Sequence, residues 1–364
     1  MDLIELPENY RDMSNEELVR RIRERKEHYG ERLLLLVHHY QRKEIVPFHD
    51  FLGDSYALSA QAAAKKNAKY IVFCGVHFMA ESADILRGEG QSVYLPNPYA
   101  GCPMADMASE REVRRAWQQL ASVVPETDIL PLSYMNSTAA LKAFTGRHGG
   151  LICTSSNARK ALDWAYARAP KAFFFPDQYL GRNTARAMGV KPDDMILWKP
   201  AHPLGGNTEE AIRKAKLILW NGYCHVHLNF TAEQVAERRA EDPTIKVVVH
   251  PECRDEVVMA ADAAGSTNFI VDFVAKQAAG SRIAIGTELN LVARLIDEHP
   301  DKRVVPLSKD ACPMCMNMFR TTLNDLAYTL DHLEAPEGPG NLVEVPEAIK
   351  ADARLALQWM LELG

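Results

Sequence analysis

The sequence predicts an α/β fold built from a threefold internal repeat with parallel sheets. Three observations support this prediction. Short apolar runs alternate with helical segments, polar side chains follow these runs in three similar arrangements, and a cysteine closes each arrangement. The chain has 364 residues and is 47% hydrophobic, so it can bury the cores of two or three compact units.

The first predicted element is a helix that begins after Ser14. Ser14 and Glu17 have the spacing of a capping box, the segment LVRRIRERKEHY continues in a helical pattern, and Gly30 supplies a stop signal. The segment is rich in charged residues. We therefore expect an exposed N-terminal helix.

Eight short apolar runs then predict the strands. Each run is bounded by turn residues and separated from the next by a helical segment, which is typical of parallel strands in α/β layers. The runs are LLLLV (33–37), YIVF (70–73), ILPL (129–132), LIC (151–153), FFF (173–175), LIL (217–219), VVV (247–249) and IAI (283–285).

Polar residues recur at the ends of these runs. In the first block His38 and Tyr40 close a strand, Gly53-Asp54-Ser55 opens a helix, and Cys102 follows. The other two blocks repeat this order: Tyr134 and Asn136, then Thr154-Ser155-Ser156-Asn157, then Cys224; and His250 and Glu252, then Gly265-Ser266-Thr267, then Cys315. We interpret the recurrence as a threefold repeat.

The repeat predicts one central site. Ligands of open α/β sheets bind beyond the carboxyl ends of the strands, so three units around an axis would direct these residues into one cavity. The helix starts offer backbone N–H groups and hydroxyls to phosphate or carboxylate, which indicates a small, multiply anionic substrate. Taken singly, Ser, Thr and Asp at helix starts are most often only caps.

Composition excludes several functional classes. The net charge is −6 and no Lys/Arg-rich run occurs, so we expect neither nucleic acid nor a membrane surface as partner. The N-terminus lacks the pattern of a signal peptide, and no run of 18 apolar residues occurs, so we expect a cytoplasmic protein. Seven cysteines without an export signal favour metal binding or simple burial over disulfides.

The cysteines divide by context. Cys74 and Cys153 lie on strand-like runs and are expected in the core, and Cys253 at a helix start is expected to be structural. Cys102, Cys224 and Cys315 lie in loop-like segments, as ligands do. Three interpretations stay open for this second group: an iron–sulfur cluster, a redox pair of Cys312 with Cys315, or a zinc site made of Cys312, Cys315, His225 and His227.

A family resemblance narrows these interpretations. Twelve strings between residues 38 and 318 resemble, in order, those of the quinolinate synthase family. They are HHYQ (38–41), GDS (53–55), IVFCGVHFMAES (71–82), AGCPMADM (100–107), YMNSTAALKA (134–143), CTSSNA (153–158), FPDQYLG (175–181), CHVH (224–227), HPEC (250–253), GST (265–267), GTELNL (286–291) and CMNM (315–318).

The resemblance implies three similar three-layer α/β/α domains around a pseudo-threefold axis, with a [4Fe-4S] cluster and the active site at the centre. It implies that Cys102, Cys224 and Cys315 bind the cluster and leave one iron open as a Lewis acid. The implied reaction condenses iminoaspartate with dihydroxyacetone phosphate to quinolinate, with loss of phosphate and water, in de novo NAD biosynthesis. Functional coupling to L-aspartate oxidase or aspartate dehydrogenase would supply iminoaspartate.

The resemblance also implies residue roles. His38 and Tyr40 would shuttle protons near the triose chain, His227 would lie close to substrate, and His250 would pair with Glu252, the carboxylate expected to abstract a proton. The implied substrate-binding residues are Asp54, Ser55, Tyr134, Asn136, Ser155, Ser266 and Thr267.

The expected domain boundaries follow the three blocks. Residues 1–120 would form the N-terminal helix and first domain, 121–229 the second domain and 230–316 the third, while helices in 317–364 would pack back on the first. Two other functions would use similar features: a hydro-lyase acting on another hydroxy acid through the same open cluster, and an iron–sulfur sensor that binds a partner.

Overall fold

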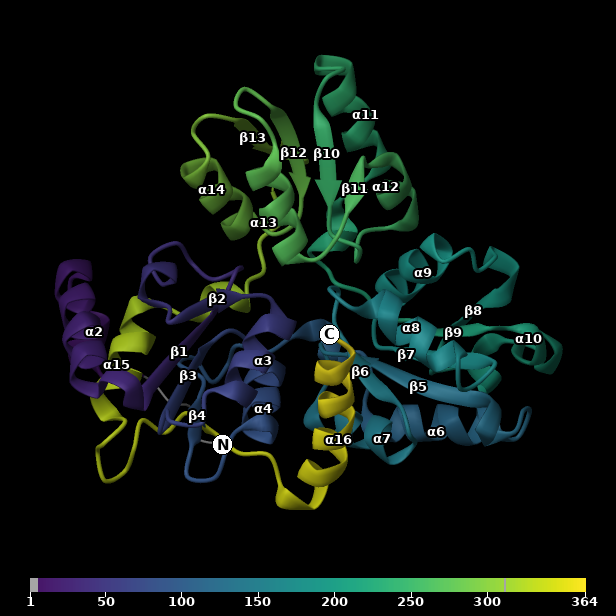
Figure 1. Cartoon of the computed structure of the whole chain (residues 1–364), viewed down its shortest axis with the longest axis horizontal. Coiled ribbons are helices and arrows are strands. Elements are labelled where there is room, and N and C mark those ends of the chain that lie inside the picture. The colour runs from purple at the N-terminus through teal and green to yellow at the C-terminus, as the bar shows by residue number, and fades with distance from the viewer. Residues whose placement is uncertain (1–5, 311) are drawn as a thin grey trace. The chain divides into compact units, whose positions relative to one another are not determined.

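The computed structural model describes residues 6–310 and 312–364 and forms two compact units (Figure 1). The first unit comprises the described residues up to Cys102 together with Met314–Pro346. The second comprises Pro103–Pro313, of which Ala311 is not described, and Glu347–Gly364. Each unit is built around parallel strands.

The first unit contains one five-stranded sheet. Its strands, in spatial order, are β14 (Leu342–Val343), β4 (Ser92–Tyr94), β3 (Tyr70–Cys74), β1 (Leu33–His38) and β2 (Phe51–Gly53). All neighbouring pairs are parallel except β14 with β4. Its helices are α1 (Glu8–Arg11), α2 (Asn15–Tyr29), α3 (Ser55–Ala64), α4 (His77–Leu86) and α15 (Leu323–His332). Helices α2 and α15 cover one face of this sheet, and α3 and α4 cover the other (Figure 1).

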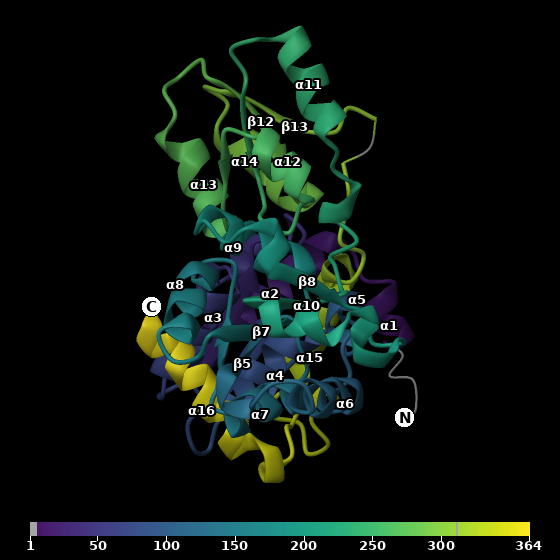
Figure 2. The same cartoon turned by 90° about the vertical axis from the view of Figure 1, so that its right-hand side faces the viewer.

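The second unit contains two fully parallel sheets. One has the spatial order β6 (Leu151–Cys153), β5 (Ile129–Tyr134), β7 (Lys171–Phe175), β9 (Leu217–Trp220), β8 (Met195–Trp198); the other has β11 (Ala263–Ala264), β10 (Lys246–Val249), β12 (Arg282–Gly286), β13 (Arg303–Pro306). The helices are α5 (Pro103–Asp106), α6 (Glu110–Ala121), α7 (Ala139–Arg147), α8 (Ala158–Tyr166), α9 (Gln178–Ala187), α10 (Glu209–Lys214), α11 (Ala232–Glu241), α12 (Asp255–Ala260), α13 (Thr267–Lys276), α14 (Leu289–Glu298) and α16 (Glu347–Leu363). Helices also cover both faces of these sheets, which gives three α/β/α layers in each case (Figures 1 and 2).

The three sheets repeat one topology. In each, the first strand of the block pairs with the second on one side and the third on the other: β2-β1-β3, β6-β5-β7 and β11-β10-β12. In this order the connections that leave the first two strands lead to opposite sides of the first strand, and open α/β proteins bind ligands at such a point. The α/β fold with three similar parallel-sheet domains is therefore confirmed, and the polar strand ends occupy equivalent positions.

All eight predicted apolar runs form strands, because each run is buried on both faces of its sheet. The predicted N-terminal helix is also present. Ser14 Oγ accepts a hydrogen bond from the Glu17 backbone N–H at 3.2 Å, and Gly30 ends the helix with a φ of +51°. The helix is not exposed all round, however: Leu18 and Ile22 are fully buried. Leu18, Ile22 and Tyr29 form a buried stripe along one face of the helix, and the many charged residues around them obscure this stripe in the sequence.

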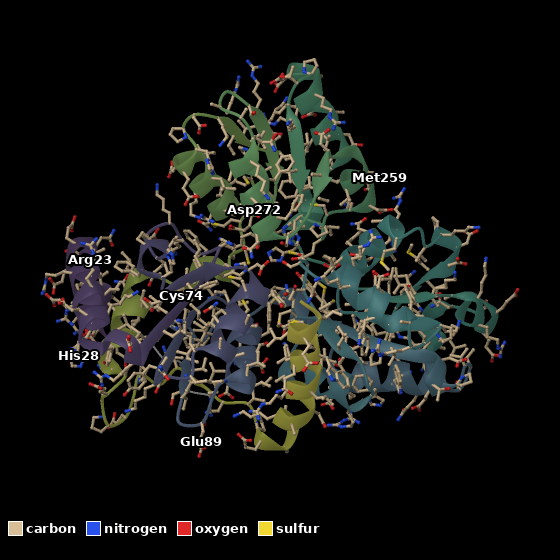
Figure 3. All side chains as sticks on the ribbon, in the orientation of Figure 1. Arg23, His28, Cys74, Glu89, Met259 and Asp272 are labelled. Carbon is tan, nitrogen blue, oxygen red and sulfur yellow. The ribbon has the colours of Figure 1, made fainter. Side chains whose placement is uncertain are left out.

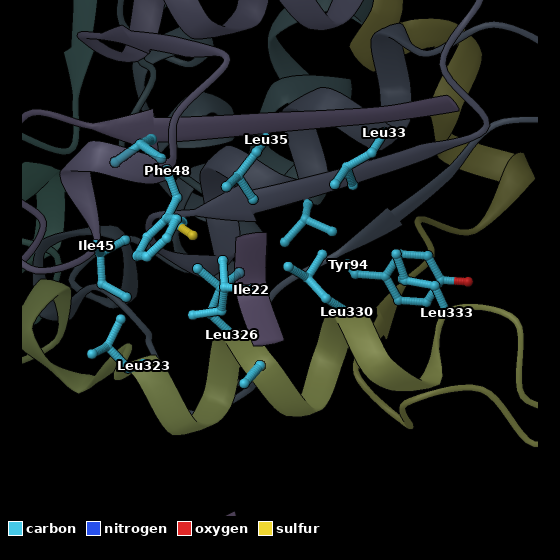
Figure 4. Packing of buried hydrophobic residues seen from close by; sticks show 14 of the residues in the cluster. Ile22, Leu33, Leu35, Ile45, Phe48, Tyr94, Leu323, Leu326, Leu330 and Leu333 are labelled. Carbon is cyan, nitrogen blue, oxygen red and sulfur yellow. The ribbon is translucent and has the colours of Figure 1, made fainter. Parts of the chain in front are cut away.

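The apolar stripe of α2 packs in the core shared with β1 and α15. Figure 4 shows Ile22 together with Leu326 and Leu330 of α15, with Leu33 and Leu35 of β1 close by. The C-terminal segment thus contributes one helix, α15, to the first unit.

Helix α16 differs from the expectation that the C-terminal helices would all pack on the first domain. It packs on α7 and β6 in the second unit (Figures 1 and 2). Gly146 of α7 allows this, because a Cβ there would lie 2.0 Å from the Asp352 carbonyl oxygen. Arg147 then donates to the Asp352 carboxylate from Nε at 3.0 Å. The contact needs a glycine on a helix face, which the apolar pattern alone did not reveal.

Asp331 ties α15 to the N-terminal helices. Its carboxylate, 5% exposed, accepts hydrogen bonds from Tyr10 Oη at 2.7 Å, Arg21 Nη1 at 2.6 Å and Arg25 Nε at 2.6 Å. Burial raises the pKa of this carboxyl, but the bonds from Tyr10, Arg25 and Arg21 outweigh burial and lower it below its usual range. The native state therefore favours the ionised form.

We expect Asp331→Asn to lower the free energy of unfolding by about 1–3 kcal/mol, since a buried charged acceptor is lost while its donors remain. Because the native pKa is depressed, the difference from wild type should be full above about pH 5 and shrink as the pH falls below about 4. Urea unfolding at several pH values measures it. The control Glu334→Gln, which changes an exposed partner of Arg32, should have a smaller effect. An equal effect of the two changes would contradict the prediction.

Within residues 6–310 and 312–364, no helix combines the length and apolar character needed to cross a membrane.

Candidate active site

Glu252 is the centre of a buried hydrogen-bonded cluster in the second unit. Its carboxylate is 3% exposed and accepts a hydrogen bond at Oε1 from Tyr134 Oη at 2.5 Å. Oε2 lies 2.9 Å from His227 Nδ1. Three residues predicted from separate motifs, more than 90 positions apart at the extremes, are thus brought into direct contact.

His227 is oriented from both ring nitrogens. An ionised Glu252 can only accept, so His227 Nδ1 carries the hydrogen of this contact. The other nitrogen, Nε2, lies 3.1 Å from Thr287 Oγ1, a fully buried hydroxyl that can donate to it. Sequence reasoning did not assign Thr287 to the site, although it lies in the GTELNL string. The contacts hold the imidazole plane and its tautomer.

His250 lies against this cluster and is fixed by its own turn. Its ring stacks on that of His227 with centroids 4.4 Å apart. Its Nδ1 accepts a hydrogen bond from the Glu252 backbone N–H at 3.3 Å, so the ring hydrogen of the neutral form is on Nε2. His250 and Glu252 both follow strand β10, and for this reason the sequence already placed them close together.

The surroundings of His250 and Glu252 decide which of the two is charged. Burial lowers the pKa of His250 to about 3, aided by the neighbouring His227, so this imidazole is neutral at physiological pH. Burial alone would raise the pKa of Glu252, but His250, His227 and the hydrogen bonds from His227 and Tyr134 lower it below its usual range. A neutral His250 contributes little of this attraction, so we attribute the lowered pKa to the two hydrogen bonds. The site combines a carboxylate with the neutral imidazole of His250.

Cys224 lies at the edge of the same cluster. Its Sγ, a ring nitrogen of His227 and a carboxylate oxygen of Glu252 all lie within 4.8 Å of one another. Thiolate, imidazole and carboxylate are all metal ligands. Cys224 itself is half-buried, whereas the other two are buried. The structure therefore groups a potential metal ligand with His227 and Glu252 of the second unit.

Gly222 sets the position of the Cys224 loop. A Cβ at this residue would lie 2.2 Å from the carbonyl oxygen of Pro176, a backbone atom that cannot move aside easily. The Gly222 carbonyl also accepts a hydrogen bond from the Gln178 backbone N–H at 3.0 Å. The loop thus approaches the end of β7 more closely than any residue with a side chain would allow.

We expect Gly222→Ala to displace this loop and lower the free energy of unfolding by about 1–3 kcal/mol. Alkylation of Cys224 in the metal-free protein, followed by peptide mass spectrometry, should become several-fold faster. Gly101→Ala is the matched control, because Gly101 precedes Cys102 and a Cβ there meets no atom within 4 Å. Unchanged Cys224 reactivity in Gly222→Ala would show that the loop tolerates the side chain.

His38 and Tyr40 form a related arrangement in the first unit. His38 Nδ1 accepts a hydrogen bond from the Tyr40 backbone N–H at 3.1 Å, and the rings meet edge to face at 4.9 Å between centroids. This is the same amide-to-Nδ1 contact, two residues apart, that joins Glu252 to His250. The shared geometry supports the internal repeat, and it leaves the ring hydrogen of a neutral His38 on Nε2.

The loop of His38 is tied to the segment that follows Cys315. Gln41 Nε2 donates to the Met318 carbonyl at 3.0 Å, and Arg42 Nε donates to the Phe319 carbonyl at 2.7 Å. The Arg42 guanidinium also lies 3.4 Å from the centroid of the Phe319 ring. A predicted catalytic loop and a predicted ligand loop are therefore one connected structure in the first unit.

The predicted substrate-binding helix starts have mixed roles. Asp54 caps α3 by accepting from the Ala57 N–H at 2.9 Å, and Ser266 caps α13 by accepting from the Phe269 N–H at 3.3 Å. Ser55 and Thr267 are the first residues of these helices. Ser155 caps no helix and lies in the turn before α8. Asp54 and Ser266 therefore each have a capping role in the structure.

Two buried oxygens near the strand ends of the second unit lack a partner among the described residues: Asn136 Oδ1, after β5, and Asp177 Oδ2, after β7. Buried polar atoms are normally hydrogen-bonded, so each is a candidate contact for a ligand or water. Burial, with Glu252 nearby, raises the pKa of Asp177 well above its usual value. Asn136 was predicted, whereas Asp177, in the FPDQYLG string, was not.

Cys74 and Cys153 lie in the core, as the sequence predicted, and Cys253 lies there too. Cys74, Cys153 and Cys253 are completely buried, and burial raises the pKa of each thiol. Figure 3 shows Cys74 inside the first unit, while Arg23 and Glu89 lie at its periphery. Cys102 and Cys315 belong to the first unit and are half-buried. Cys312 is half-buried as well, but burial raises its pKa to about 12.

Comparison with known proteins gives consistent matches. The family model described as quinolinate synthetase A protein matches residues 20–362. Quinolinate synthase of Corynebacterium glutamicum is 50% identical over 361 residues, which covers 98% of this chain and 90% of the relative. The enzyme of Bacillus subtilis is 46% identical (98% and 96% covered), and that of Geobacillus kaustophilus is 49% identical (100% and 98% covered).

Proposed function

We infer that this chain is a quinolinate synthase, because it belongs to the quinolinate synthetase A family. We propose that it condenses iminoaspartate with dihydroxyacetone phosphate to quinolinate, releasing phosphate and water, in de novo NAD biosynthesis. The observation that carries the proposal is the Glu252 cluster, because it joins Tyr134 and His227 to a carboxylate beside Cys224. The proposed reaction needs proton transfers next to a metal centre, and these residues place proton donors and acceptors beside a thiol that could bind a metal.

The thiols of this chain fit a [4Fe-4S] cluster. Cluster ligands are thiolates, which full burial in apolar surroundings disfavours. Cys74, Cys153 and Cys253 are fully buried with raised pKa values, which leaves Cys102, Cys224, Cys312 and Cys315. Among these four, the family resemblance implies Cys102, Cys224 and Cys315, and we propose these three as the ligands. A cluster held by three cysteines would supply an open iron that polarises a substrate oxygen or nitrogen.

Proton transfer falls to the residues around Glu252. The carboxylate is kept ionised by donation from Tyr134 Oη and His227 Nδ1, so it is available to accept a substrate proton. His250 stays neutral and presents a hydrogen on Nε2, which can donate a hydrogen bond to a leaving hydroxyl. We propose matching roles for His38 and Tyr40, whose geometry repeats that of His250 and Glu252.

The anionic groups of the substrates need donors. We propose that Ser55, Ser266 and Thr267 at the starts of α3 and α13 bind phosphate and carboxylate, with Asp54 as the cap that fixes the start of α3. We propose that Ser155, in the turn before α8, adds a further donor. Asn136, with an unpartnered buried oxygen, would orient the nitrogen of iminoaspartate or of the forming ring. Coupling to L-aspartate oxidase or aspartate dehydrogenase is proposed as the source of iminoaspartate.

Anaerobic reconstitution followed by an assay for quinolinate tests the function. The protein should form quinolinate from freshly generated iminoaspartate and dihydroxyacetone phosphate, and omission of either substrate should remove the product. Iron and sulfide are counted on the same sample. A protein with a full cluster but no quinolinate would contradict the proposal and favour another hydro-lyase or a sensor.

A further inference from the structure

Asn183 of α9 contacts the turn that carries Glu252. Its Nδ2 donates to two backbone carbonyls, those of Pro251 and Cys253, both at 2.9 Å. These are the carbonyls on either side of Glu252. The side chain is 7% exposed, so water does not replace these bonds readily. One amide group therefore holds both flanks of the residue at the centre of the cluster.

The position of Asn183 is fixed by the first turns of α9. Asp177 caps the helix by accepting from the Tyr179 and Leu180 backbone N–H groups at 2.6 and 3.2 Å. Gly181 lets the helix approach its sheet, since a Cβ there would lie 2.6 Å from a Leu219 methyl carbon. The FPDQYLG string thus builds a rigid support and places Asn183 one and a half turns after the cap.

The two hydrogen bonds of Asn183 join two blocks of the internal repeat. Asn183, Tyr134 and His227 belong to the second block of the chain, whereas the turn at Pro251–Cys253 belongs to the third. The Glu252 carboxylate reaches Tyr134 at 2.5 Å and His227 at 2.9 Å only if this turn keeps its place relative to the second block. The amide of Asn183 ties the turn's backbone to that block at two carbonyls, and Arg254, next to the turn, adds a longer contact from Nε to the Leu228 carbonyl at 3.4 Å.

We propose that Asn183 is a positioning residue: its side-chain amide holds the Pro251–Cys253 turn so that the Glu252 carboxylate faces Tyr134 and His227. This rests on the proposed function, because it concerns the geometry of the same site. Asn183 itself touches none of the predicted reacting groups through its side-chain bonds, so it acts through Glu252. Displacement of a catalytic group by about 1 Å can cost on the order of 100-fold in rate.

The test compares Asn183→Leu with Asn207→Leu. Asn207 is the matched control, because its Nδ2 also donates to backbone carbonyls in the second unit, those of Leu197, Leu204 and Gly205, and not to the Glu252 turn. In Asn183→Leu we expect kcat to fall about 10–100-fold with KM within about twofold and iron content unchanged. Asn207→Leu should retain kcat within about twofold.

A double variant separates positioning from a general loss of stability. If Asn183 acts through Glu252, Asn183→Leu should lower kcat by less than about twofold in the Glu252→Gln background. If the losses of kcat caused by Asn183→Leu and Glu252→Gln multiplied in full in the double variant, the proposal would be overturned. Should Asn183→Leu fail to fold, Asn183→Ser, which keeps one hydroxyl donor, replaces it with a smaller expected loss.

Hydrogen–deuterium exchange gives a readout that does not depend on activity. The peptide covering residues 250–257 should exchange faster in Asn183→Leu than in wild type, whereas Asn207→Leu should leave it unchanged. If this peptide exchanged at the wild-type rate in Asn183→Leu, the proposal that Asn183 holds the turn would be overturned. If the wild-type protein forms no quinolinate, the proposed function fails, and the exchange experiment still decides the role of Asn183.

Discussion

Replacing any one of Cys102, Cys224 and Cys315 with serine is expected to remove the iron–sulfur cluster and with it all quinolinate formation. Serine is isosteric with cysteine but replaces the soft thiolate that iron–sulfur clusters require. We expect about four irons per chain in the anaerobically reconstituted wild type and less than about one in each variant. Iron and sulfide analysis, with the visible absorption of the cluster, measures this.

Cys312→Ser is the matched control for this prediction. Cys312 is half-buried like the proposed ligands and lies three positions before Cys315, but its Sγ contacts the Thr287 carbonyl at 3.8 Å and its pKa is raised to about 12. It should keep the cluster. Cluster loss in Cys312→Ser with retention in Cys315→Ser would reverse the ligand assignment, and zinc in the purified protein would favour the alternative site.

The strands that could be predicted are those that are buried on both faces. Runs such as LLLLV in β1 and FFF in β7 are central and apolar throughout, so the sequence alone reveals them. The strands that were missed lie at or near the sheet edges. β2 has three residues and β11 has two, and too few apolar side chains mark them. Tertiary pairing, rather than local pattern, makes these segments strands.

The candidate site divides in a similar way. Tyr134, His227, His250 and Glu252 were named because polar residues at strand ends recur and match a family, and the structure brings all four together. Thr287, Asp177 and Asn183 were missed. Thr287 and Asn183 act through contacts that span the chain, such as the 68 positions between Asn183 and Pro251, whereas Asp177 caps its own helix. No spacing rule encodes such a contact, because it depends on how α9 seats against its sheet.

Changing Glu252 to glutamine is expected to lower kcat about 10²–10⁴-fold while the cluster is retained. The amide has nearly the same shape, but it cannot accept a proton at physiological pH. It also presents its NH₂ group to either Tyr134 Oη or His227 Nδ1, both of which donate to the carboxylate in the native protein. Two donors would then face each other in a buried site, so the hydrogen-bonded geometry would be lost together with the charge.

Single substitutions of the two donors separate charge from geometry. Tyr134→Phe and His227→Gln each leave the Glu252 carboxylate in place but remove or alter one hydrogen bond that lowers its pKa. The pKa of Glu252 should therefore rise in both, so the acid limb of the kcat profile should move to higher pH. Asp84→Asn controls for the loss of any buried carboxylate, since Asp84 bonds to Arg87 and Val345 in the first unit. If Asp84→Asn lowered kcat as much as Glu252→Gln, the effect would reflect lost stability, and the catalytic role of Glu252 would have to be abandoned.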